Sequence, residues 1–159
     1  MNRFSVLAKA VALAAAVAGC GIAGAAGTQN LNVTATVTGT CKFSSTVQTF
    51  TFGTLDPSAA VLTAGSGASV KYRCTKGTVA TGVTAGNGGN FLAGSRRMGN
   101  GTDFINYSLN VAGGTQTGTG FATAANDLSL TLTGSVLAVD YQNVSAGAYT
   151  DIVVLSVAP

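Results

Sequence analysis

The sequence contains no histidine, no tryptophan and no glutamate, and it has only two prolines. Without histidine, neither a Ser-His-Asp nor a Cys-His arrangement can activate a nucleophile. The only acidic side chains are five scattered aspartates, and their spacing does not suggest an acid pair. Nothing around the lysines singles one out as a nucleophile. We therefore expect no catalytic residue and no cofactor.

The first 26 residues are typical of an export leader. Arg3 and Lys9 give a positive start, an apolar run follows over 11–17, and small residues follow over 19–27. This pattern, with Ala-x-Ala-like cleavage options near Ala26, predicts a signal peptide over 1–26 that is removed on export. The apolar run is too short for a transmembrane helix.

Cys20 gives the leader a second interpretation. The preceding Val-Ala-Gly resembles a bacterial lipobox, in which Cys20 would become a lipidated first residue anchored to a membrane. We favour a leader that is removed, because good cleavage sites lie just beyond this cysteine. Both interpretations use up Cys20 and leave two cysteines in the mature domain.

Cleavage after Ala26 would leave 133 residues, enough for one domain with a core and too few for two. Threonine and valine punctuated by glycine favour a protein built of short strands. The mature part carries six basic side chains against five aspartates, a formal charge of +1. A nearly neutral domain has no electrostatic footprint for nucleic acid, so we expect no such partner.

Within the stretch from Thr28 to Cys41, residues 31–38 alternate strictly between apolar and polar. A period of two places Leu31, Val33, Ala35 and Val37 on one face of a strand, with polar residues between them. No two-residue turn joins this strand to an immediate hairpin partner. Its apolar face must therefore be covered by a distant segment of this chain or by another chain.

Cys41 and Cys74 are the pair that remains in an exported chain, and oxidising compartments favour a disulfide between them. Such a bond would close a loop of about 34 residues and stabilise the fold by roughly 3.8 kcal/mol on the chain-entropy model. It would tie the start of the sheet to a later strand. A metal site is the alternative, but two thiols without histidine are a poor zinc set, so we expect no metal.

The rest of the chain predicts short strands separated by turn residues. Gly134 suggests a bend in the penultimate strand, and the run 152–155 is apolar on both faces, as in a strand at the middle of a sandwich. No long amphipathic helix appears. With 31–38, about seven strands predict an all-β, immunoglobulin-like sandwich; the others are 47–52, 68–74, 78–85, 104–111, 128–139 and 149–157.

Two local patterns have simple explanations. The run Gly86-Asn87-Gly88-Gly89 lacks the glycine spacing and the following helix of a phosphate loop, so it predicts a hairpin loop. Arg96 and Arg97 could bind an anion, but two adjacent arginines at the junction of a loop and a strand are usually solvated.

Several of these stretches together resemble the spore coat U domain family, which includes the pilin subunits of archaic chaperone–usher pili. The resemblance covers essentially the whole mature chain. Its most specific parts are the Arg-Arg-Met-x-Asn stretch over 96–100 and the closing Gly-x-Tyr-x-Asp pattern over 147–151. The Gly-Thr-Cys after the first strand and the stretch VKYRCTKG around Cys74 also match.

The resemblance implies a sandwich that lacks its final strand and is completed by a strand donated from another subunit. It divides the chain into a signal peptide over 1–26, a donor-strand extension over 27–39 and a pilin domain over 40–159. Leu31, Val33, Ala35 and Val37 would fill the groove of a neighbouring copy or a related pilin, and the family's disulfide falls on Cys41 and Cys74. The implied partners are a periplasmic chaperone and an outer-membrane usher.

These implications predict a fibre subunit that is exported through the periplasm to the cell surface, for attachment or biofilm formation. One domain favours a shaft subunit, because a tip adhesin is expected to carry a second, receptor-binding domain. A secreted coat protein is the alternative within the family. A surface carbohydrate-binding module is the alternative of another class, with little support because the chain has no tryptophan and only four tyrosines.

Overall fold

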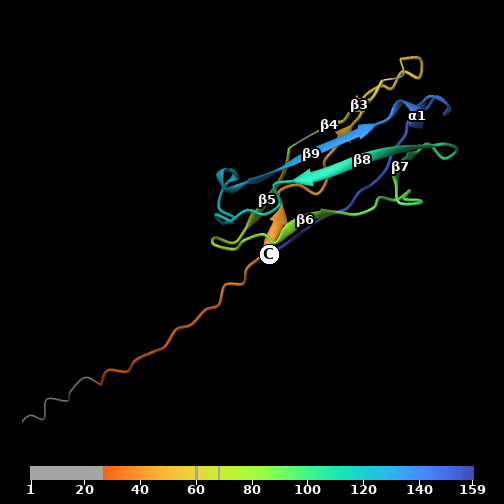
Figure 1. Cartoon of the computed structure of the whole chain (residues 1–159). Helices are drawn as coiled ribbons and strands as arrows, with labels where there is room; N and C mark the ends of the chain where they lie inside the picture. The colour runs from red at the N-terminus through yellow and green to blue at the C-terminus, as the bar shows by residue number, and fades with distance from the viewer. Residues whose placement is uncertain (1–26, 60, 68) are drawn as a thin grey trace, which may run out of the picture. The chain divides into compact units, whose positions relative to one another are not determined.

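The computed structural model describes residues 27–59, 61–67 and 69–159, so the predicted leader and Cys20 lie outside the described residues. Residues 36–159 form one compact unit, and residues 27–35 belong to a separate one. The compact unit is an all-β, immunoglobulin-like sandwich built from antiparallel strands, which confirms the predicted fold class (Figure 1).

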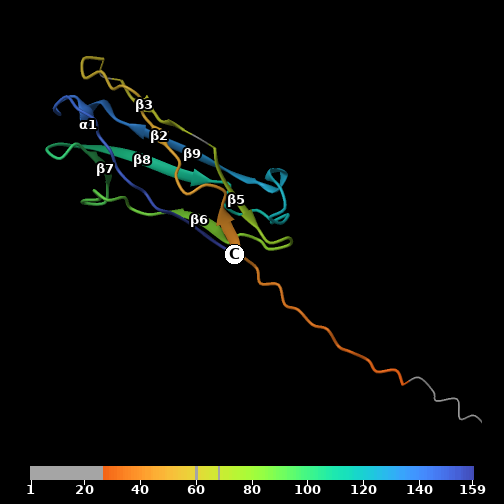
Figure 2. The same cartoon turned by 180° about the vertical axis from the view of Figure 1, so that it is seen from behind.

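The larger sheet has the strand order β1-β5-β9-β8-β7, and β3 also pairs with β9. The two nine-residue strands β8 and β9 run side by side along its middle, with Val111 opposite Leu132 (Figures 1 and 2). Val70 of β5 lies opposite Leu130 on the other edge of β9. The strands are β1 (Cys41–Phe43), β3 (Thr63–Ala64), β5 (Val70–Cys74), β7 (Arg96–Gly99), β8 (Phe104–Ala112) and β9 (Leu128–Val136).

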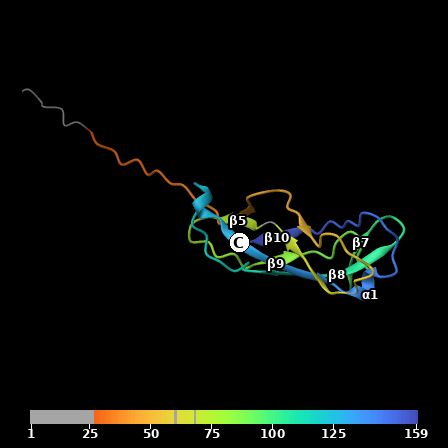
Figure 3. The same ribbon diagram turned by 90° about the horizontal axis from the view of Figure 1, so that it is seen from above.

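Two further pairs complete the sandwich. β6 (Gly82–Ala85) pairs with β10 (Leu155–Ala158), and β2 (Phe50–Thr51) pairs with β4 (Ser66–Gly67). β10 is drawn near β5 and β9 in Figure 3, and its Leu155 and Val157 pack against the core cluster that contains Val70 of β5 and Leu130 of β9. One short α-helix, α1 (Ala138–Tyr141), and a 3-10 turn, η1 (Ala124–Asn126), are the helical elements of the described residues.

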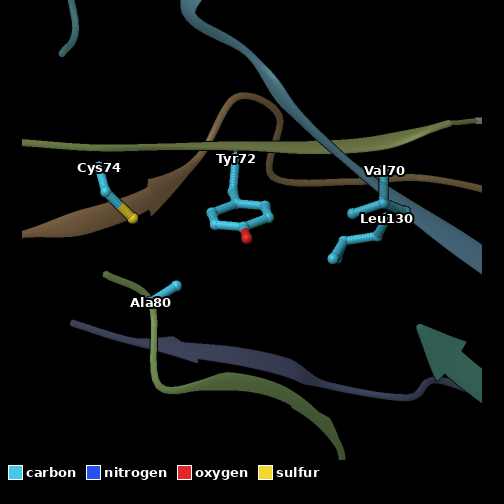
Figure 4. Packing of buried hydrophobic residues seen from close by; sticks show 5 residues of the cluster. All are labelled: Val70, Tyr72, Cys74, Ala80 and Leu130. Carbon is cyan, nitrogen blue, oxygen red and sulfur yellow. The ribbon is translucent and has the colours of Figure 1, made fainter. Parts of the chain in front are cut away.

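The core consists of two apolar clusters. The first contains Val70, Tyr72 and Leu130 of the larger sheet, whose side chains point toward Ala80 and the ribbon of β10 (Figure 4). The second contains Phe52, Ile105, Val136 and Tyr141. The two clusters lie at different points along the larger sheet. Each cluster therefore lies next to a different part of the edge of the sandwich.

Several predicted strands are confirmed, in 70–74, 82–85, 104–112 and 128–136. The predicted bend at Gly134 is wrong, because β9 continues straight through it. A Cβ at Gly134 would lie 2.4 Å from the backbone oxygen of Ser108 on β8. The glycine is therefore needed for close approach of two strands, and the chain leaves the strand only after Val136, to form α1.

The stretch 27–40 forms no strand in the structure, and β1 starts only at Cys41. A strand exists through repeated hydrogen bonds to a neighbour, and among the described residues only the Thr40 oxygen of this stretch accepts a backbone hydrogen bond, from the Thr75 amide at 2.9 Å. The alternation in the sequence therefore marks a segment that is able to form a strand but has no partner within the described chain.

Candidate functional site: a groove beside the last strand

Two open hollows lie between an early segment of the domain, 41–57, and the last one, 144–157, and together they are called the groove. Its larger part has a volume of about 670 Å³ and lies between 50–57 and 144–149. The buried residues Phe52, Ile105 and Tyr141 form part of its lining, and all three belong to the second core cluster. This part of the groove thus opens directly onto the core.

The smaller part of the groove, of about 490 Å³, lies between β1 and β10. Phe43 lines it on one side, and Leu155 and Val157 line it on the other. These three side chains pack against the first core cluster but remain half-buried. Both clusters are therefore incompletely covered on the same side of the sandwich, between the first and the last segments of the domain.

The backbone of the last segment of the domain is sparsely paired before β10 begins, over 149–154. Thr150 exchanges two hydrogen bonds with Gly99, and the Val154 oxygen accepts one from Gly86. Between them, the backbone groups of 151–153 form no hydrogen bond with any described residue. Because β10 pairs only with β6, its other edge is also open. An open edge of this kind can accept a further strand.

The prediction that 152–155 lies at the middle of a sandwich is wrong for the described chain. Ile152 is 80% exposed and Val154 is 67% exposed, and the strand begins only at Leu155. An apolar run is buried on both faces only where a layer packs on each face, and here only the face that carries Val153 and Leu155 is half-buried. The run 152–155 lies beside the groove, and this position explains why it is exposed and not buried.

The predicted donor residues are exposed. Leu31 and Val33 are each 85% exposed and Val37 is 81% exposed, and Ala35 is exposed as well. Three large apolar side chains in one short segment are thus in contact with solvent, an arrangement that usually marks a binding segment. Leu31, Val33, Ala35 and Val37 therefore present their apolar side chains to solvent.

The chain joins the domain through a threonine contact. The Thr75 hydroxyl accepts a hydrogen bond from the Thr40 amide at 3.1 Å and donates one to the Thr38 oxygen at 3.2 Å. Gly39 between them packs so closely that a Cβ would lie 3.0 Å from the Thr78 hydroxyl oxygen. These contacts hold 38–40 against the domain.

The predicted disulfide is confirmed, because Cys41 and Cys74 are bonded across the β1–β5 pair. The two residues lie directly opposite one another in the register. Cys74 is completely buried in the first core cluster. The bond fixes the start of the domain to a later strand of the larger sheet, β5, as the sequence led us to expect.

Arg96 and Arg97 are not a solvated pair, so that expectation is wrong. Arg96 donates to the backbone oxygens of Gly86, Ala85 and Leu109 at 2.8–3.2 Å. Arg97 donates to the Asn90 oxygen at 2.9 Å, and its guanidinium lies 4.2 Å from the centre of the Phe104 ring. The two side chains are half-buried and bind the loop that connects β6 to β7.

Asp151 of the closing Gly-x-Tyr-x-Asp pattern contacts the same loop. Its Oδ1 accepts hydrogen bonds from the Gly89 and Asn90 amides at 2.8 and 3.3 Å, and its Oδ2 accepts one from the Tyr107 hydroxyl at 2.6 Å. Burial raises the pKa of Tyr107 well above its usual value, and the bond to Asp151 raises it further. The tyrosine is therefore a neutral donor at ordinary pH.

The described residues hold no group of three or more side chains suited to a metal ion. Within the same residues, no helix has the length and apolar character needed to cross a membrane. The lining of the larger part of the groove is mixed, with core residues such as Phe52 and Ile105 beside polar residues such as Thr51 and Ser145.

The comparisons with known proteins agree with the resemblance seen in the sequence. No curated protein matches the chain. The family model for the Spore Coat Protein U domain matches residues 27–156, which include both the exposed extension and the groove. The chain therefore belongs to the Spore Coat Protein U domain family.

Proposed function

We propose that this chain is a structural subunit of an archaic chaperone–usher pilus, and that it polymerises by donor-strand exchange. Its family occurs in chaperone–usher pilus subunits and in spore coat-like proteins, which are structural proteins of the cell surface. In this proposal the extension 27–39 of one copy enters the groove of the next copy. The domain over 40–159 supplies that groove.

The observation that carries the proposal is that one chain contains two complementary unpaired features. The extension has an apolar face with no cover, made by Leu31, Val33, Ala35 and Val37. The groove exposes half-buried core residues and an unpaired backbone edge. A strand with apolar residues at every second position is the shape that would cover both core clusters while pairing with that edge.

The dimensions and energies support this arrangement. The stretch from Leu31 to Val37 spans roughly 20 Å when extended, as in a strand of a sandwich. Burial of each Val or Leu would stabilise the junction by roughly 1.5–3 kcal/mol, and the smaller Ala35 by less. Backbone hydrogen bonds to the open edge would add affinity, and the side-chain positions would set the register.

Each copy would donate one strand and accept one, so the contact is head-to-tail. A contact of this kind does not close on itself and grows into a filament. A periplasmic chaperone would occupy the groove before assembly, and an outer-membrane usher would mediate the exchange. This gives a route from the periplasm to the cell surface, where the fibre would serve attachment or biofilm formation.

The substitution Val33→Arg tests the donating half of the junction. A charge in the middle of the apolar face would have to be buried without a partner, so we expect fibre assembly to fall below a tenth of the wild-type level. Fibres sheared from cells that make only the variant would be measured on unheated denaturing gels. The chaperone-bound subunit should stay soluble, because the substitution leaves the domain untouched.

Thr34→Arg is the matched control, because it places the same charge one residue away on the polar face of the same strand. We expect it to assemble at a level close to the wild type. Normal assembly by Val33→Arg, or equal loss in both variants, would contradict donation of this face to a groove.

A further inference from the structure

We propose that Asp151 is the residue that holds the accepting edge of the groove in place before a donated strand arrives. This inference rests on the proposed function and concerns the accepting half of the same junction. Asp151 is a positioning residue, because it acts on the last segment of its own domain and does not contact the donor.

The need for such a residue follows from the sparse pairing of the accepting edge. Between Thr150 and Val154, the backbone forms no hydrogen bond to any described residue. Ile152 and Val154 are largely exposed, so side-chain burial also holds this stretch weakly. A strand edge that is to pair with a donor must nevertheless be extended and correctly placed, or ordering it would weaken binding.

The carboxylate of Asp151 supplies the missing contacts. It accepts hydrogen bonds from the amides of Gly89 and Asn90 in the β6–β7 loop and from Tyr107 of β8. Tyr107 also packs against Phe52 of the groove lining, with ring centroids 5.8 Å apart. One side chain thus joins the accepting edge to the loop, to the larger sheet and to the core beside the groove.

The loop that Asp151 contacts is itself fixed from its other side. Arg96 binds the oxygens of Ala85 and Gly86, and Arg97 binds the Asn90 oxygen. Gly88 has a φ of 87°, and a Cβ there would lie 2.1 Å from Oδ2 of Asp151. Both the positive φ and the close approach of the Asp151 carboxylate favour glycine at position 88.

Three variants remove the contact in different ways. Asp151→Ala deletes the carboxylate, Tyr107→Phe deletes only the hydroxyl, and Gly88→Ala displaces the carboxylate without touching the groove. We expect Asp151→Ala to lower ladder formation on unheated gels about tenfold or more, because three donors lose a charged acceptor. Tyr107→Phe should have a smaller effect in the same direction, and Gly88→Ala should resemble Asp151→Ala.

Asp127→Ala is the matched control. Asp127 also accepts side-chain hydrogen bonds, from Arg73 and Ser44, but it holds the β1–β5–β9 end of the sheet. We expect this variant to be less stable than the wild type and still to form a ladder. Ladder loss equal to that of Asp151→Ala would show a general stability effect and would overturn the inference.

A mixture of two full-length variants separates acceptance from donation. Val33→Arg is expected to accept a strand but not to donate one, and Asp151→Ala is expected to donate but not to accept. Each alone should give monomers, whereas cells that make both should give dimers of one copy of each, identified by mass spectrometry on unheated gel bands.

The outcomes distinguish this inference from the proposed function. A normal ladder from Asp151→Ala alone, or no mixed dimer, would overturn the positioning role while leaving the wild-type ladder as support for strand exchange. If the wild-type chain itself forms no ladder, the proposed function fails, and the inference fails with it.

Discussion

At the scale of single residues, the polar side chains of this domain bind its own backbone or one another. Asp127 illustrates the pattern, since its Oδ1 accepts hydrogen bonds from Arg73 at 2.5 Å and from Ser44 at 2.9 Å. The bond from Arg73, followed by that from Ser44, holds the pKa of Asp127 below its usual value. Hydrogen bonds from Ser58 and Ser145 lower the pKa values of Asp56 and Asp103 in the same way.

These shifts predict loss of stability in acid. A carboxyl group with a depressed pKa in the folded state stabilises the protein above its unfolded pKa, near 3.8, and loses that effect as the pH falls through the folded value. We expect the urea midpoint to be flat from pH 7 to 5 and to fall below pH 4. Denaturation curves at a series of pH values would measure this.

Asp127→Asn is the comparison variant for the acid series. Its midpoint should be lower at pH 7 but should change less between pH 5 and 2. A slope as steep as that of the wild type would mean that Asp127 carries none of the acid sensitivity.

At the scale of elements, close packing between β8 and β9 limits what their residues can be. Gly134 lies opposite Leu109, and an added Cβ would meet the Ser108 oxygen at 2.4 Å and the Phe50 ring at 3.1 Å. The contact with Phe50 joins the middle of the larger sheet to the lining of the groove. Either the strands or the ring would have to shift to admit a methyl group.

Gly134→Ala should therefore lower the free energy of unfolding by roughly 1–3 kcal/mol, as overpacking usually does. Gly147→Ala is a suitable control, because its Cβ would meet a side-chain nitrogen of Asn100 at an ordinary 3.4 Å. Urea denaturation of both in the Val33→Arg background would measure the domain without assembly. Equal stability of the two variants would contradict the close approach seen at Gly134.

The elements also show how far the sequence predicts the fold. Alternation found β5, β8 and most of β9, because one face of each is buried and the other is not. It missed β7, whose four residues are all half-buried and carry no alternation. It also missed the two-residue strands β3 and β4, which are too short to show a period.

The candidate site was only partly predictable for a related reason. The extension is visible in the sequence because its alternation is strict and local. The groove is not visible in the sequence, because it forms where two segments about 100 residues apart leave core residues uncovered. The role of Arg96 was missed because its three acceptors are backbone oxygens, which no residue pattern reveals.

At the scale of the whole molecule, the chain has an exposed apolar segment that fills no groove. It also has a groove that no strand fills. The contacts of Thr75 with Thr38 and Thr40 hold the junction between them, and the disulfide fixes the next residue, Cys41, to β5. If donated strands join the copies, the junctions between neighbouring copies must be strong but noncovalent.

The most direct test is a denaturing gel of protein sheared from the native cell surface, run with and without prior heating and with disulfides reduced throughout. We expect a ladder of bands in the unheated lane. The ladder should collapse to one band after heating, because donated strands would resist the detergent until heat melts them out. A single monomer band in both lanes would contradict strand exchange and would favour a coat protein whose extension binds elsewhere.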